Sequence, residues 1–129
     1  MKIQRVYSKV VWEEQVGYSR AVKAGNHIYV TGTAPVDESG QGVHAPGDAY
    51  AQAKRCLDLI ERALGKLGAK RANIVRTRMF VTDISQWKQY GRAHAEFFAA
   101  DRPATSMIEV KALIDPRMLI EIEADAVVE

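Results

Sequence analysis

The sequence predicts an α+β domain in which two helices cover one side of a β-sheet. Two segments repeat apolar residues at spacings of three and four, the pattern of a helix with one apolar face. Shorter runs before, between and after these segments are rich in β-branched and aromatic residues, which favour strands. The 129 residues, 47% hydrophobic and 26% charged, fit a single domain, residues 1–129, with one core.

A β-hairpin is the first element expected. The strand-like runs Tyr18–Ala24 and His27–Gly32 are separated by Gly25-Asn26, a pair suited to the positive φ angles of a tight turn. The next stretch, Ala34–Gly47, holds four Gly or Pro residues before its last glycine, which indicates a surface loop with turns. This loop is a candidate lid or rim for a binding site.

The first helix is expected over Asp48–Leu67. The Asp48 side chain can cap its start, and Gly68 can end it. The apolar positions that share one helix face are Ala49, Ala53, Cys56, Leu57, Ile60, Ala63, Leu64 and Leu67. The lone Cys56 is therefore expected to be a packed core thiol, in keeping with a reducing compartment.

Three strands and a second helix complete the expected elements. Strands are predicted over Ile74–Thr82, Ala104–Val110 and Leu119–Val128, and a helix over Ser85–Phe98. One face of that helix carries Trp87, Tyr90, His94 and Phe97. The three aromatic residues are expected in the core rather than in a base-stacking platform, and the histidine at the polar edge of the packed face.

The sheet is expected to have two unlike faces, because successive side chains of a strand point to opposite sides. In the last strand apolar residues alternate with acidic ones: Ile120, Ile122, Ala124 and Ala126 against Glu121, Glu123 and Asp125. Arg76 and Arg78 also share one strand face, as do Thr105, Met107 and Glu109. The polar side is either an ordinary solvated surface or a charge-complementary subunit interface that contains a cleft.

Charge and motifs narrow the classes of partner. The 18 Lys and Arg against 16 Asp and Glu leave a net charge of +2, too small to supply by itself the phosphate attraction of a typical nucleic-acid-binding protein. Neither a signal peptide nor a membrane-spanning run is indicated, so the cytoplasm is the expected location. His27, His44 and His94 are far apart and no glycine-rich nucleotide motif is present, so no metal and no cofactor are expected.

Several segments resemble, in order, motifs of the Rid/YjgF family. Gly17–Val22 is similar to the family's Tyr-Ser-Gln-Ala motif, and Ile28–Pro35 to its strand ending in Ser-Gly-Gln-x-Pro. Pro103–Val110 and Leu119–Ala124 resemble its C-terminal signature, so the likeness covers nearly the whole chain. The resemblance implies a chorismate-mutase-like α+β fold with a mixed sheet, a homotrimer, and three small-molecule clefts between subunits.

The resemblance also implies site residues. Tyr18, Thr31, Thr105, Met107 and Glu121 occupy positions that line the family's cleft. In the family's deaminases an arginine at the position of Thr105 binds the substrate carboxylate, and the glutamate at the position of Glu121 positions or activates water. A threonine offers one neutral hydrogen bond instead of a charge-assisted pair. This difference corresponds to a binding affinity about 5- to 30-fold lower for the carboxylate. Glu121 is thus the candidate catalytic residue and the other four are candidate substrate-binding residues.

Arg20 is a further candidate substrate-binding residue. It stands where the family usually has glutamine, two residues after Tyr18, so both side chains are expected on one face of the strand. Its guanidinium is a candidate replacement for the missing anion-binding arginine. The alternatives are that it pairs with an acid such as Glu109 or Glu123, or points to solvent.

Two classes of function remain open from the sequence. The first is an enzyme that hydrolyses an imine, an enamine or a related amino compound other than a simple 2-imino carboxylate, with Glu121 acting on water. The second is a small-metabolite-binding protein that has kept the cleft and lost the reaction. Ribonuclease activity, an older label for some family members, is a third and weaker possibility, because the net charge is near neutral and no acid–base pair for phosphodiester cleavage is visible.

Overall fold

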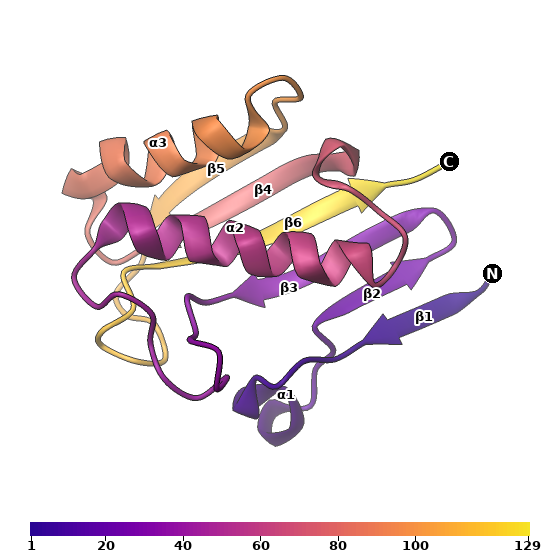
Figure 1. Cartoon of the computed structure of the whole chain (residues 1–129), viewed down its shortest axis with the longest axis horizontal. Helices are drawn as coiled ribbons and strands as arrows, with labels where there is room; N and C mark the ends of the chain where they lie inside the picture. Colours follow the sequence, from indigo (N-terminus) through magenta and orange to yellow (C-terminus); the bar gives the residue numbers. More distant parts are fainter.

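The computed structural model describes all residues 1–129 and contains one six-stranded sheet with the spatial order β1-β2-β3-β6-β4-β5 (Figure 1). The strands are β1 (Ile3–Val6), β2 (Ala21–Ala24), β3 (His27–Thr33), β4 (Ile74–Val81), β5 (Ala104–Glu109) and β6 (Ile120–Val127). Only β4 and β5 pair in parallel; every other pair of neighbours is antiparallel. The sheet is therefore mixed, as expected.

Two long helices lie side by side on one face of this sheet (Figure 1). They are α2 (Ala49–Gly65), which packs against β3 and β6, and α3 (Trp87–Phe98). A short helix, α1 (Val11–Val16), lies near the end of β1, and 3₁₀ turns span Arg71–Asn73 and Ile84–Gln86. The α+β fold with two helices on one face is confirmed, whereas β1 and α1 were not predicted from the sequence.

The core lies between the sheet and these two helices. The predicted alternation of β6 is confirmed, because Ile120 and Ile122 are fully buried toward the helices while Glu121, Glu123 and Asp125 stay half-buried on the other face. Cys56 is fully buried, and the Asp48 carboxylate caps α2 by accepting a hydrogen bond from the Ala51 N–H at 2.9 Å. The expectation for Trp87 is wrong: it is the first residue of α3 and is 54% exposed, since the buried stripe of that helix begins one turn later.

The hairpin of β2 and β3 forms with a shorter first strand than expected. Gly17 ends α1 with φ +87°, and the Tyr18 N–H still donates to the Glu13 carbonyl, so the backbone becomes extended only from Ala21. At the turn Gly25 has φ +62°. The residues between α1 and β2 are thus held against the helix, which brings the Tyr18 side chain beside that of Arg20.

A second, smaller apolar cluster lies beneath the loop of residues 34–47. Val36 pairs with Val43 across the loop and packs with Met118. Partly buried side chains complete this cluster: Val10, Trp12, Ala34, Leu59 and Leu113. The cluster is separate from the main core, so the loop that follows β3 has its own packed base.

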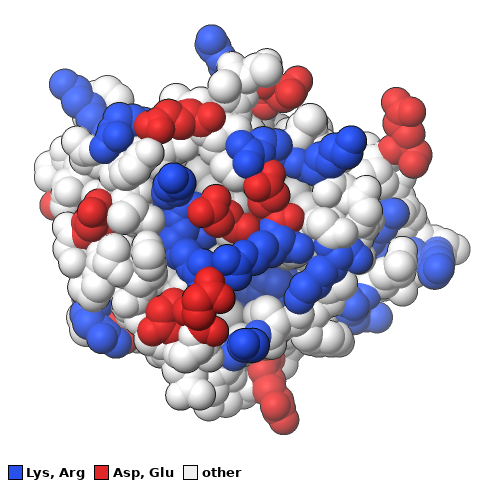
Figure 2. Space-filling view, in the orientation of Figure 1, with Lys and Arg blue, Asp and Glu red and all other residues white.

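The two faces of the sheet differ in character. Figure 2 shows the helix-covered side, where Lys and Arg side chains form a band interspersed with Asp and Glu. On the uncovered face Arg78 Nη1 lies 3.1 Å from Glu123 Oε1 and 3.3 Å from Asp125 Oδ2. Among the helices, none combines the length and the apolar character needed to cross a membrane.

Candidate functional site

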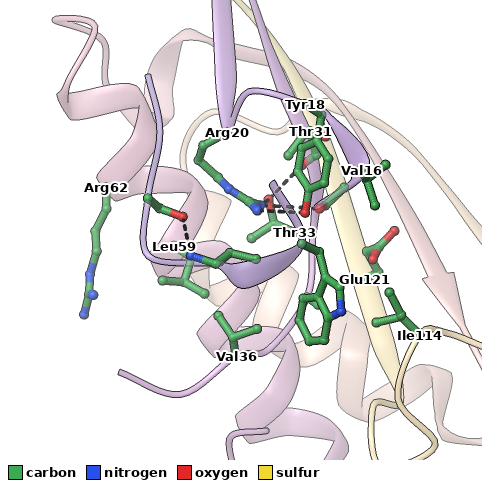
Figure 3. A pocket seen from close by; sticks show the side chains of 15 residues that line it. Val16, Tyr18, Arg20, Thr31, Thr33, Val36, Leu59, Arg62, Ile114 and Glu121 are labelled. Atoms are coloured by element: carbon green, nitrogen blue, oxygen red, sulfur yellow. Dashed lines mark hydrogen bonds between the residues drawn. The ribbon is translucent and has the colours of Figure 1, made fainter. Parts of the chain in front are cut away.

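A cavity of about 280 Å³ opens at the end of β3 (Figure 3). Its walls come from α1, from the loop after β3, from α2, from the start of β6 and from the segment between β5 and β6. The polar side chains that line it are Ser8, Tyr18, Arg20, Thr31, Thr33, Arg62 and Glu121. The apolar side chains are Val10, Trp12, Val16, Ala34, Val36, Leu59 and Ile114.

An irregularity in β3 makes room for the Glu121 carboxylate. The pairing of β3 with β6 shifts register between Val30 and Thr33, so Thr31 and Gly32 lie out of regular pairing opposite the start of β6. Gly32 has no side chain, and a Cβ built on it would stand 2.5 Å from Glu121 Oε2. The carboxylate therefore occupies the space that any other residue at position 32 would fill.

Glu121 is a half-buried carboxylate without a hydrogen-bond donor from the chain. No N–H or O–H group donates to it, in contrast to Glu13, which accepts from Ser8 and Arg20. Burial raises the pKa of Glu121, with the charge of Arg20 opposing the rise and that of Glu123 adding to it. A carboxylate with a raised pKa is a better proton acceptor near neutral pH than an ordinary one.

Arg20 is held by a buried ion pair with an acid that was not expected. Its Nε lies 3.1 Å from Glu13 Oε2, and the two side chains are only 6% and 5% exposed. Its Nη1 donates to Thr33 Oγ1 at 3.2 Å. The alternative that Arg20 pairs with an acid is confirmed, but the acid is Glu13 of α1 rather than Glu109 or Glu123, and the solvent position is wrong. Arg20 lines the cavity, but its charge is already matched.

Tyr18 and Thr31 lie on the same side of the cavity as Arg20 (Figure 3). The Tyr18 hydroxyl accepts a hydrogen bond from Arg20 Nη2 at 3.5 Å, and the guanidinium carbon lies 5.6 Å from the centre of its ring. Burial raises the pKa of Tyr18, so its hydroxyl stays protonated and can donate to a ligand. Four of the six candidate residues, Tyr18, Arg20, Thr31 and Glu121, are thus brought together within one chain.

Thr105 and Met107 lie elsewhere in the chain. Both are on β5, the edge strand, on the face that the helices cover, whereas Glu121 is on the other face. Thr77 Oγ1 donates to Thr105 Oγ1 at 2.7 Å and lies 2.8 Å from His94 Nε2, and Met107 packs against the main core. Burial lowers the pKa of His94. Within one subunit, the Thr105 hydroxyl belongs to a hydrogen-bonded network with Thr77 and His94 and does not line the cavity.

The site also contains residues that the sequence reasoning missed. Glu13 and Trp12 belong to α1, a segment for which no element was predicted. Two signals in this segment indicate a helix: acidic residues Glu13 and Glu14 in the first turn and Gly17 directly after the last residue. As to metals, no three His, Cys, Asp or Glu side chains converge as ligands would.

Comparisons with known proteins agree with this architecture. The family model described as endoribonuclease L-PSP matches residues 11–128. The 3-aminoacrylate deaminase RutC of Acinetobacter baylyi is 35% identical over 109 residues, which cover 84% of this chain and 85% of that protein.

Solved structures are similar to this chain along nearly its whole length. The structure of Rv2704 from Mycobacterium tuberculosis, a member of the YjgF/YER057c/UK114 family, superposes with a TM-score of 0.89 at 46% identity and covers 98% of this chain and 100% of that one. The YjgF gene product of E. coli superposes with a TM-score of 0.84 at 31% identity, covering 96% and 98%. With its mixed sheet, its two helices on one face and these matches along nearly its whole length, the chain belongs to the Rid/YjgF family.

Proposed function

We propose that this protein is a Rid-type hydrolase in which Glu121 activates water to hydrolyse an imine, an enamine or a related amino compound. The observation that carries the proposal is the Glu121 carboxylate itself. It lies in the cavity beside Gly32, it has no donor from the chain, and burial raises its pKa. The similarity to a 3-aminoacrylate deaminase supports the same class of reaction.

The reaction follows from the proton chemistry of this carboxylate. Glu121 accepts a proton from water as the water oxygen attacks the carbon of the C=N bond. The π electrons of that bond move to the nitrogen, which takes up a proton from solvent. The carbinolamine hydroxyl then releases its proton to solvent as its oxygen re-forms a C=O bond. The C–N bond breaks, and ammonia leaves with the proton that Glu121 returns. Imine and water thus give a carbonyl compound and ammonia. In this proposal the Tyr18 hydroxyl, which lines the same cavity and stays protonated, donates to a polar atom of the reacting group.

The proposed assembly is a homotrimer in which a neighbouring subunit completes each cleft. Thr105 and Met107 lie on the edge strand β5, away from the cavity, which fits a cleft built from two copies. The uncovered sheet face carries matched charges and the exposed side chains of Tyr29 and Ile108, at 50% and 45%. Light scattering at micromolar concentration tests this assembly, and a monomer mass would refute it.

The hydrolysis itself is tested with 2-iminobutyrate on wild type, Glu121→Gln and Thr105→Arg. Activity of wild type that falls at least tenfold in Glu121→Gln supports the proposed role of the carboxylate. Activity that appears only in Thr105→Arg supports a water-activating site whose natural substrate lacks the carboxylate of 2-iminobutyrate. Wild-type activity that is equal in Glu121→Gln would refute the proposal.

A second candidate function is binding of a small metabolite without turnover. The observation that favours it is the Thr77 hydrogen bond to Thr105, because it engages the side chain that stands in place of the deaminase arginine. No hydrolysis by any of the three variants, together with a ligand-dependent rise in melting temperature, would support this candidate. Cleavage of RNA by wild type that is lost in Glu121→Gln would instead support ribonuclease activity, the function in the description of the matching family model.

A further inference from the structure

The cavity has an apolar wall close to Glu121. Val16 and Ile114, on two different segments, are 68% and 58% exposed, and Figure 3 shows both beside Glu121. Val36 and Leu59 line the cavity further in and belong to the small apolar cluster beneath the loop. Single exposed apolar side chains are ordinary, but several gathered around one cavity indicate an apolar ligand.

Within one chain, the charged side chains of the cavity place no free cation beside Glu121 for a ligand carboxylate. All three guanidinium nitrogens of Arg20 donate within the chain, to Glu13, Thr33 and Tyr18 among others. Arg62 is 55% exposed and shares Glu38 with Arg55, and Figure 3 shows its side chain directed away from Glu121. The one acid that lines the cavity is Glu121, and it has no partner. A ligand carboxylate next to the reacting carbon would meet a like charge there, whereas an amine or iminium nitrogen would meet an opposite one.

We propose that the ligand of this cavity is an imine, enamine or amine with an apolar substituent and without a carboxylate next to the nitrogen-bearing carbon. The nitrogen faces Glu121 and the substituent lies along Val16, Ile114 and the wall beyond them. A volume of about 280 Å³ holds about nine non-hydrogen atoms if each takes the roughly 30 Å³ of a water molecule. This inference names the substrate class of the proposed hydrolase and rests on that function for the orientation of the nitrogen.

Three series of stable probes test the inference by calorimetry on the whole protein. They are n-alkylamines from ethylamine to hexylamine, alkanoates of the same lengths, and 2-aminoalkanoates of the same lengths. We expect amine affinity to rise about fourfold with each methylene that the wall covers. Alkanoates are expected not to bind measurably, and each 2-aminoalkanoate is expected to bind more weakly than the amine of equal length.

Two variants test separately the contact of the ligand nitrogen and the contact of its apolar substituent. Glu121→Gln is expected to weaken every amine by the same factor and to leave the increment per methylene unchanged. Ile114→Ser is expected to lower that increment, while short amines bind as in wild type. Ile84→Ser is the matched control, because Ile84 is 38% exposed and lies outside the cavity. This variant should bind every alkylamine of the series with the affinity of wild type.

The inference fails if 2-aminoalkanoates bind more tightly than the matching amines, if alkanoates bind, or if affinity does not grow with chain length. Its failure is distinguishable from failure of the hydrolase proposal. Amine affinities that grow with length in a protein without hydrolytic activity would keep the inference and refute the reaction. Glu121-dependent hydrolysis of 2-iminobutyrate without any effect of chain length would keep the reaction and refute the inference.

Discussion

The buried ion pair of Arg20 and Glu13 leads to a stability prediction. Arg20→Gln introduces the residue that the family usually has at this position, and Glu13, which is 5% exposed in the present structure, loses its charged partner. Removing one member of a buried pair costs about 3–5 kcal/mol. The Ser8 N–H and hydroxyl still donate to the Glu13 carboxylate, so we expect the lower end, about 3 kcal/mol.

Urea unfolding at pH 7 and fixed protein concentration measures this loss. With an unfolding entropy of about 2.1 cal/mol/K per residue, about 3 kcal/mol corresponds to a melting temperature lower by about 11 °C in this chain of 129 residues. Arg92→Gln is the matched control, because Arg92 is 53% exposed and pairs with Glu96 at 3.6 Å, and exposed pairs contribute less than about 1 kcal/mol.

A double-mutant cycle isolates the pair from the other contacts of Arg20. Glu13→Gln combined with Arg20→Gln leaves no unpaired buried charge, so we expect a coupling energy of about 2 kcal/mol between the two changes. Losses below about 1 kcal/mol for each single variant, adding up in the double variant, would refute the reasoning that Arg20 and Glu13 stabilise the chain as a buried pair.

Three further changes test other parts of the site. Burial raises the pKa of Glu121, so the stability contributed by its protonated form is present below its ordinary pKa of 4.5 and is lost as pH rises through the raised value. The urea midpoint of Glu121→Gln should therefore exceed that of wild type by more at pH 8 than at pH 4. An equal difference at the two pH values would contradict this prediction. Thr77→Val removes the fully buried hydroxyl that bonds His94 Nε2 and should lower the unfolding free energy by about 1–2 kcal/mol, a loss that an unchanged urea midpoint would disprove. Gly32→Ala should push the Glu121 carboxylate aside and weaken alkylamine binding at least tenfold with little change in stability. The control Gly91→Ala, in open space on α3, should leave binding unchanged and raise the unfolding free energy by up to about 1 kcal/mol. Equal binding by the two alanine variants would show that Gly32 does not set the position of Glu121.

Most of the fold could be predicted from the sequence, because the signals that define it are local. The three- and four-residue spacing of α2, its Asp48 cap and the alternation of β6 each depend on neighbouring residues, and the structure confirms them. The hairpin turn could be predicted because its signal, Gly25-Asn26, is also local. The first strand and α1 were missed, since they are short and their apolar pattern is weak.

The candidate site was less predictable, because its contacts join residues far apart in the chain. Tyr18, Thr31 and Glu121 do meet at one cavity. The partner of Arg20 could not be read from strand periodicity, because Glu13 reaches it from a helix. Nor could periodicity show that Thr105 faces Thr77 while Glu121 lies on the opposite side of the sheet.

Residue identities and their spacing account for the two layers of this protein, for the face of β6 that carries its acids, and for the lack of a cationic side chain at position 105. Each of these follows from residue identity and short-range periodicity. The pairing of Arg20 with Glu13, and the unpaired state of Glu121 beside Gly32, depend on how distant segments pack in the folded chain. Burial and the pairing of charges depend on which distant segments pack together, so the chemical character of the cavity emerges only in the folded chain.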